Sequence, residues 1–128
     1  MMVVDASVVV SALAEGGARG VRAERALADE VLAPQHIDLE VLHALARFER
    51  ERRLSSGELE ARVEELEAMP IERLDIAPLV ARAHSLRHNL TAYDASYVAL
   101  AELLDVPLAT FDDRLSRSPN LPCRIVRP

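Results

Sequence analysis

The fold is decided by the opening stretch Met2-Val3-Val4-Asp5-Ala6-Ser7. A β-branched run that stops on an acid is typical of a buried strand with a polar carboxyl end. Residues 6–14 are mostly small and apolar and stop just before two glycines, which indicates a short helix. A strand that passes directly into a helix is the repeating unit of a parallel sheet covered by helices.

The rest of the chain repeats this alternation, with proline closing several elements. We expect strands at residues 2–4, 30–34, 71–76, 107–111 and 123–126, and helices at residues 6–14, 19–29, 37–54, 55–69, 78–89 and 91–104, with a helical turn at residues 112–116. Short strands that alternate with helices predict a parallel sheet covered on both faces. The sequence therefore predicts one α/β domain over residues 1–128, with three α/β/α layers around a short-stranded, mostly parallel central sheet.

Composition excludes several classes of function. The chain has 128 residues, with 21 acids against 15 bases and a net charge of −6, and every base is arginine. The absence of lysine excludes P-loop ATPases, Schiff-base enzymes and receiver domains. Only four residues are aromatic, which argues against modules that stack bases on aromatic platforms, and the acidic balance argues against indiscriminate polyanion binding.

The expected environment is the cytoplasm. Cys123 is the single cysteine, so the chain has no internal disulfide and no CxxC motif. The apolar N-terminus carries Asp5 and has no basic segment before it, unlike a signal peptide. No apolar run approaches the roughly 20 residues that cross a bilayer, so we expect no membrane association.

Four acids interrupt apolar sequence at the ends of predicted elements. Asp5 and Asp112 follow strands, while Glu40 and Asp94 lie near the starts of helices. Parallel strands bring their carboxyl ends to one edge of the sheet, where open α/β folds bind ligands. Each acid alone is also explained as a helix N-cap or as a partner of the helix dipole.

Taken together, the four acids point to a metal site. Carboxylates that converge repel one another, and a divalent cation relieves that repulsion. Mg²⁺ or Mn²⁺ prefers such oxygen ligands, activates water and stabilises charge on a phosphate leaving group. His84 and His88 lie four residues apart on a predicted helix, but no third ligand accompanies them as a zinc site requires.

Three further residues have two open interpretations each. Ser7 and Thr110 lie two residues from Asp5 and Asp112, so each either orients a carboxylate or contacts phosphate, or is an ordinary cap and strand residue. Arg47 lies two turns after Glu40 on one helix face, where it either meets RNA phosphate or pairs with the residue four positions on, Glu51.

The acids lie in four segments that resemble the acidic motifs of PIN-domain ribonucleases. The segments are Val3-Val4-Asp5-Ala6-Ser7, Ala33-Pro34 to Glu40-Val41, Tyr93-Asp94-Ala95-Ser96-Tyr97-Val98-Ala99-Leu100-Ala101 and Leu108-Ala109-Thr110-Phe111-Asp112. In length and motif order, the whole chain is similar to the VapC toxins of bacterial toxin–antitoxin pairs. One departure is Asp113 directly after Asp112, where the spacing from Thr110 favours Asp112 as the site acid.

The resemblance implies a function and partners. It implies hydrolysis of RNA phosphodiesters with Mg²⁺ or Mn²⁺ at Asp5, Glu40, Asp94 and Asp112, a cognate antitoxin that blocks the site, and a homodimer. The apolar positions of residues 39–48 and 59–69 are candidates for the dimer interface or the antitoxin groove. Two alternatives stay open: a catalytically silent PIN-like protein-interaction domain, and a Mg²⁺-dependent phosphohydrolase of another substrate. A phosphatase of the haloacid dehalogenase type would need an Asp at Ser7 and a lysine.

Overall fold

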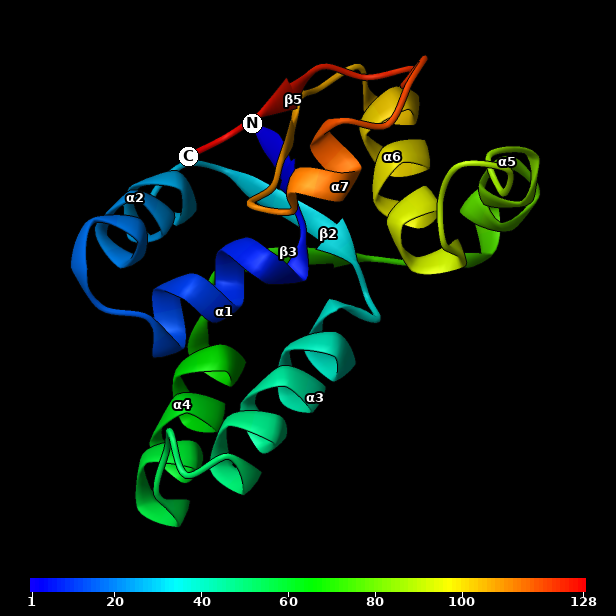
Figure 1. Ribbon diagram of the computed structural model, residues 1–128. Helices are drawn as coiled ribbons and strands as arrows, with labels where there is room; N and C mark the ends of the chain where they lie inside the picture. The colour runs from blue at the N-terminus through cyan, green and yellow to red at the C-terminus, as the bar shows by residue number, and fades with distance from the viewer.

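The central sheet has five strands, all parallel, in the order β3-β2-β1-β4-β5. A computed structural model describes residues 1–128 (Figure 1). The strands are β1 (Met2–Val4), β2 (Val31–Pro34), β3 (Ile71–Leu74), β4 (Leu108–Ala109) and β5 (Ile125–Val126). The expected parallel sheet is confirmed. The first strand has the expected bounds, and the other four strands are shorter than the sequence suggested.

The first strand occupies the centre of the sheet. Val3 and Val4 are fully buried, and β1 pairs with β2 on one side and with β4 on the other. Parallel strands covered on both faces favour β-branched residues, which explains why this short apolar run forms the middle strand. At its carboxyl end the Asp5 amide donates to the Ala109 carbonyl at 3.2 Å, so the ends of β1 and β4 lie side by side.

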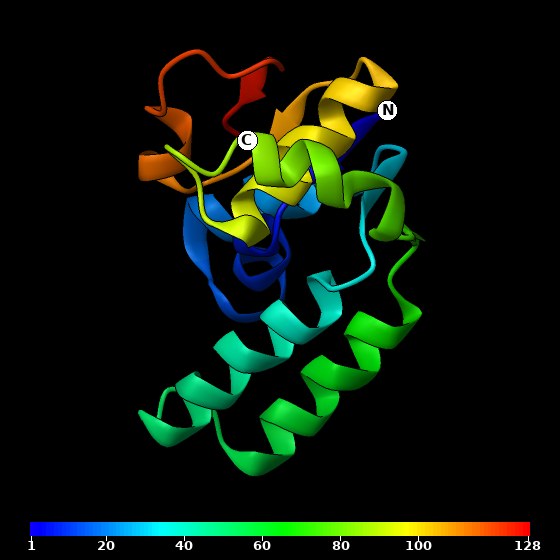
Figure 2. The same ribbon diagram turned by 90° about the vertical axis from the view of Figure 1, so that its right-hand side faces the viewer.

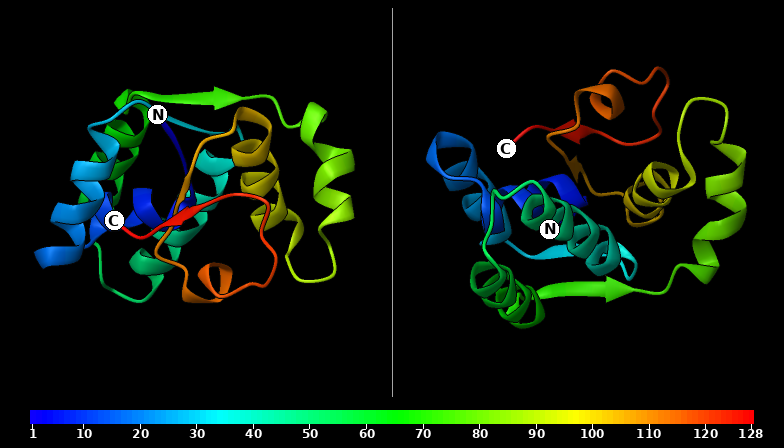
Figure 3. Two further views of the ribbon diagram at one scale, coloured as in Figure 1. Left: turned by 90° about the horizontal axis from the view of Figure 1, so that it is seen from above. Right: turned by 60° about the horizontal axis from the view of Figure 1, so that its bottom comes forward.

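Helices cover both faces of the sheet (Figure 3). One face carries α1 (Ala6–Ala14), α2 (Gly17–Leu27), α3 (Ile37–Arg50) and α4 (Ser56–Ala68). The other face carries η1 (Ala77–Leu79), α5 (Val80–Ser85) and α6 (Ala92–Leu104), and α7 (Asp113–Ser116) follows β4. The expected three layers are confirmed. No helix combines the length and apolarity of a membrane span.

The helix α6 packs against the sheet along most of its length. Residues 95–101 are all buried, and Tyr97 is the largest of the fully buried side chains. A helix segment that is apolar on every side belongs in a core, which explains why these residues are buried. Its N-terminus is fixed by Thr91, whose hydroxyl accepts from the Asp94 amide at 3.1 Å.

The helices α3 and α4 form a hairpin that extends away from the sheet (Figure 2). The predicted helix over residues 37–54 ends at Arg50, because Arg52 is left-handed with φ 57° and the Arg53 amide donates back to the Phe48 carbonyl. The helix α4 then starts at a capping box. Ser55 Oγ accepts from the Glu58 amide at 3.1 Å, and the Glu58 carboxylate accepts from the Ser55 amide.

The predicted helix over residues 78–89 is broken. The chain forms η1 with Pro78 in its first turn, and α5 ends at Ser85. The Leu86 amide donates to both the Arg82 and the Ala83 carbonyls, and this bifurcated bond tightens the last turn. The remaining residues 86–90 form a turn that leads to α6.

Candidate active site

Asp5 ends β1 and caps α1 from a buried position. Its side chain is 5% exposed, and its Oδ1 accepts from the amides of Ser7 and Val8 at 3.0 and 3.4 Å. Burial raises the pKa of Asp5 to about 6, although hydrogen bonds from Ser7 and Thr110 act in the opposite direction. The N-cap interpretation of Asp5 is therefore correct. The raised pKa also shows that burial of the charged carboxylate is unfavourable for the folded state.

Two hydroxyl groups orient Asp5. Ser7 Oγ donates to Asp5 Oδ1 and Thr110 Oγ1 donates to Asp5 Oδ2, so both carboxylate oxygens are held. The same hydroxyls accept backbone bonds from the β4–α7 loop, with Phe111 N to Ser7 Oγ and Asp112 N to Thr110 Oγ1 both at 2.9 Å. Of the two interpretations of Ser7 and Thr110, the structure thus places both residues against the carboxylate of Asp5.

Glu40 lies in the first turn of α3, and its carboxylate accepts a hydrogen bond from a helix on the other face of the sheet. The Tyr97 hydroxyl of α6 donates to Glu40 Oε1 at 2.8 Å. Burial and the charge of Glu40 raise the pKa of Tyr97 above its ordinary value, so the phenol keeps the proton that it donates. His36 Nδ1 also lies 2.8 Å from Glu40 Oε1, but it makes no aligned hydrogen bond there.

Asp94 and Asp112 lie close enough for the charge of Asp112 to act on the Asp94 carboxyl. Asp94 lies in the first turn of α6, and burial raises its pKa first, followed by the negative charges of Asp112 and Glu40. Arg114 opposes this effect, because its guanidinium Nη2 lies 3.3 Å from Asp94 Oδ2. Three of the four predicted acids therefore interact electrostatically at one place.

Asp112 and its neighbour Asp113 have different roles. Asp112 caps α7, and its Oδ1 accepts from the amides of Arg114 and Leu115 at 2.8 and 3.2 Å. Asp113 is exposed and pairs with Arg127, whose hydrogen bond and charge hold the pKa of Asp113 below its usual value. Of the two adjacent acids, Asp112 is the one whose charge acts on the Asp94 carboxyl.

Three of the four carboxylates lie near the Tyr97 side chain, and one of them, Glu40, accepts its hydrogen bond. Negative charge from Glu40, Asp5 and Asp94 contributes to the raised pKa of Tyr97. Oxygen donors of this kind fit Mg²⁺ or Mn²⁺ and lack the nitrogen or sulfur ligands typical of zinc. No three His, Cys, Asp or Glu side chains form a closed ligand set in this arrangement.

Three residues at the site were missed in the sequence. His36 and Tyr97 both contact Glu40, and Arg114 pairs with Asp94. Helical spacing was the available signal for two of them, because Tyr97 lies three residues after Asp94 and His36 lies four residues before Glu40. Residues at these spacings share one face of a helix.

The arginines nearest to the acids differ from the one singled out in the sequence. Arg47 Nε lies 3.8 Å from Glu51 Oε1, which is the local ion pair that the sequence also allowed. In contrast, the guanidinium groups of Arg19 and Arg22 lie 4.6 and 6.0 Å from the ring centre of Phe111, the residue before Asp112. Arg19 is also paired with Glu15 at 3.0 Å, while Arg22 donates to the Pro128 carbonyl at 3.0 Å and has no carboxylate partner there.

Comparisons with known proteins identify the family of this chain. The sequence model of the PIN domain family matches residues 2–121. The ribonuclease VapC1 of Mycobacterium tuberculosis is 43% identical over 125 residues, covering 96% of this chain and 94% of its own length. Ribonuclease VapC3 of the same organism is 41% identical over 118 residues, covering 91% of this chain and 86% of its own length.

Solved structures share the fold at low sequence identity. The M. tuberculosis toxin VapC20, described as cleaving the sarcin–ricin loop, superposes with a TM-score of 0.69 at 21% identity, covering 97% of this chain and 99% of its own. VapBC2 from Rickettsia felis, bound to a promoter DNA fragment, superposes with a TM-score of 0.71 at 12% identity, covering 99% and 98%.

Proposed function

This chain belongs to the PIN-domain family, with VapC ribonucleases as its relatives, and we propose that it is a Mg²⁺- or Mn²⁺-dependent endoribonuclease that acts as the toxin of a toxin–antitoxin pair. The observation that carries the proposal is the mutual repulsion at the carboxyl edge of the sheet. There the pKa of Asp94 is raised by the charges of Asp112 and Glu40 in addition to burial. A divalent cation is the partner that such a group of carboxylates lacks.

Asp5, Glu40, Asp94 and Asp112 would hold the cation, directly or through water. When bound, the ion supplies Lewis acidity to the scissile phosphate and to the attacking water. The chain itself supplies orientation, because Ser7 and Thr110 fix both oxygens of Asp5 while Tyr97 fixes Glu40.

The arginines supply the positive charge that the substrate requires. Arg114 pairs with Asp94, and it is the more exposed member of that pair at 74% against 18%. With a cation held at Asp94, the Arg114 guanidinium would be available to an RNA phosphate, for which its planar fork is suited. Arg19 and Arg22 lie over the ring of Phe111, the residue before Asp112.

The proposed partners are RNA, a cognate antitoxin and a second copy of the chain, all in the cytoplasm. An antitoxin arginine directed at Asp94 would take the place that Arg114 holds here, blocking the site without metal. Leu39 on α3 is 70% exposed beside Glu40, which makes this part of the hairpin a candidate contact surface. Whether it serves the antitoxin or the dimer is decided by the composition of the purified complex.

Purified protein should cleave single-stranded RNA only when metal is present. We expect Mn²⁺ or Mg²⁺ to restore cleavage of a sequence-randomised RNA pool after treatment with EDTA, with activity at least about 100-fold above the metal-free rate. Sequencing of the product ends measures both the rate and the site preference. Full activity in excess EDTA would contradict the metal-dependent mechanism.

The alternatives predict different results in the same samples. A catalytically silent interaction domain would show neither cleavage nor a Mn²⁺-dependent rise in melting temperature. A phosphohydrolase of another substrate would show the thermal shift and release phosphate from small phosphate esters while leaving the RNA pool intact. Expression without the antitoxin adds a cellular test, because growth arrest should occur with the wild type and be absent with Asp94→Asn.

Replacing Tyr97 with phenylalanine should weaken metal binding while preserving the fold. The change removes only the hydroxyl that donates to Glu40 at 2.8 Å and leaves the buried ring in place. Loss of such a supporting bond typically costs roughly 10- to 100-fold in metal affinity. The measurement is cleavage rate against Mn²⁺ concentration, where the half-saturating concentration should rise with little change at saturation. An unchanged metal dependence would remove Tyr97 from the positioning of Glu40.

A further inference from the structure

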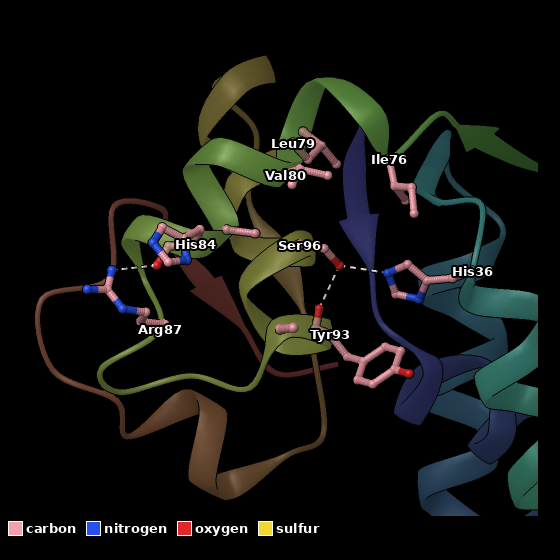
Figure 4. Close-up of a pocket in the computed structure, with 10 residues that line it drawn as sticks. His36, Ile76, Leu79, Val80, His84, Arg87, Tyr93 and Ser96 are labelled. Carbon is pink, nitrogen blue, oxygen red and sulfur yellow. Dashed lines mark hydrogen bonds between the residues drawn. The ribbon is translucent and has the colours of Figure 1, made fainter.

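A pocket of about 350 Å³ lies between η1, α5 and the start of α6 (Figure 4). Its floor is mostly apolar, with Leu79 and Ala83 among the residues that line it. His36 and Tyr93 lie on one side of the close-up and Arg87 on the other. None of the acids proposed to hold metal lines this space.

The pocket shares a wall with the acidic site. His36, which lines the pocket, lies 2.8 Å from Glu40, and Tyr93 directly precedes Asp94. Ser96 Oγ donates to the Tyr93 carbonyl at 2.6 Å, which leaves it to accept from His36 Nε2 at 2.7 Å. The imidazole is therefore fixed in place, edge-on to the Tyr93 ring at 5.5 Å. An occupant of the pocket would therefore lie next to the acidic site.

The chemistry of the lining selects a particular ligand. Six of the ten lining residues are hydrophobic, none is acidic, and the polar ones include Arg87 and His84. The Tyr93 ring is 60% exposed, so it offers a free aromatic surface at the rim. A flat, largely apolar ring attached to a phosphate matches an apolar lining with an aromatic rim and basic side chains. An acidic lining would repel the phosphate.

We propose that this pocket is a nucleobase subsite, which takes one base of the RNA next to the scissile phosphate. The inference rests on the proposed function, since it assigns part of the same substrate to this second space. A volume of about 350 Å³ admits a nucleoside and is too small for a folded peptide segment. The subsite gives the enzyme a sequence preference at one position, while the acidic edge acts on the backbone common to all positions.

The first test measures binding without cleavage. Titration of metal-free protein with each of the four ribonucleoside 5′-monophosphates should shift the NMR methyl signals of Ala83 and Ala92 for at least one of them at millimolar concentration. Ribose 5-phosphate, which carries the phosphate without a base, should leave these signals unchanged. Ala83→Phe fills the pocket and Tyr93→Ala removes its aromatic rim, so both variants should lose the response. Ala81→Phe is the matched control, because Ala81 is exposed on the same helix outside the pocket.

The second test separates failure of the subsite from failure of the nuclease. In an RNA that the protein cleaves, an abasic nucleotide at the preferred position should reduce kcat/KM roughly tenfold or more for the wild type and for Ala81→Phe. For Ala83→Phe and Tyr93→Ala, intact and abasic substrates should be cleaved at the same, lower rate. Cleavage with an abasic penalty that both variants retain would overturn the subsite alone. Absence of cleavage together with absence of nucleotide binding would overturn both proposals.

A second copy of the chain is the competing occupant. If the Ala83 and Ala92 signals shift with protein concentration, and sedimentation shows two copies that Tyr93→Ala separates, the pocket is an interface and the nucleobase proposal is wrong.

Discussion

Replacing Asp5 with asparagine should abolish metal-dependent RNA cleavage and raise the melting temperature of the metal-free protein. Removal of one of four ligand charges forfeits several kcal/mol of transition-state stabilisation, or a rate loss of roughly 10³-fold or more. The folded state should gain stability, because Asp5 is 5% exposed and burial raises its pKa to about 6. Asparagine is as good an N-cap as aspartate, so the bonds from the α1 amides survive.

The size of the stabilisation depends on pH in a defined direction. The Asp5 carboxyl has a folded pKa of about 6 against 3.8 for an ordinary Asp. Between these values the native state keeps a proton that the unfolded chain releases, so stability falls as pH rises. This difference in pKa corresponds to roughly 3 kcal/mol in the free energy of unfolding. The melting temperature of Asp5→Asn relative to wild type should therefore increase from pH 4 to pH 6 and level off above that.

Adjacent acids provide the control. Asp113 is exposed and pairs with Arg127, away from Asp94, so Asp113→Asn should keep cleavage within a few-fold of wild type. Calorimetry from pH 4 to 8 in EDTA, with cleavage assays in Mn²⁺, measures both effects on the same preparations. Retained cleavage in Asp5→Asn would sink the assignment of Asp5 as a ligand. A melting temperature of Asp5→Asn below that of wild type at pH 7.5 would show that the Asp5 charge does not destabilise the folded protein.

Much of the fold was predictable because local pattern and tertiary context agree. The run Val3-Val4 before Asp5 is consistent only with a buried parallel strand, and residues 95–101 are apolar on every side of a helix, as a core helix requires. Boundaries were harder where capping decides them. Arg52 takes a left-handed conformation that stops α3, although nothing distinguishes it in sequence from the arginines beside it.

The charged residues of the candidate site could be proposed from the sequence, but their contacts with side chains from other layers could not. Asp5, Glu40, Asp94 and Asp112 could be proposed as site residues because acids in apolar sequence are rare, and sheet topology brings strand ends together. Ser7 and Thr110 were recognised as candidates because each lies two residues from an acid, although the contact of Thr110 with Asp5, 105 residues away, has no sequence spacing. Tyr97 was not found, because it reaches Glu40 from another layer across 57 residues. Each partner is an ordinary residue of its own helix or strand until the layers pack.

Gly20 shows that stability, too, depends on contacts that the sequence does not reveal. Its replacement has the largest destabilising effect that we predict. In sequence it is a glycine inside a helix, which is a small cost. In the structure, a Cβ at Gly20 would lie 2.1 Å from the Glu15 carbonyl oxygen and 3.2 Å from its carbon, at the point where α1 ends. These are backbone atoms that no rotamer change can move. The glycine is therefore what lets α2 pack directly on α1.

Gly20→Ala should destabilise the protein by about 3 kcal/mol, lowering the melting temperature by roughly 10 °C, because α2 must shift outward and expose part of Ala23 and Leu27. The same change at Gly57 should have the opposite sign. Gly57 lies in α4 with nothing within 4 Å of an added Cβ, so alanine gains helix propensity worth about 0.5–1 kcal/mol. Thermal unfolding of the two variants in one buffer measures the difference. If Gly20→Ala melts within about 2 °C of wild type, α1 and α2 do not pack as closely as this placement requires.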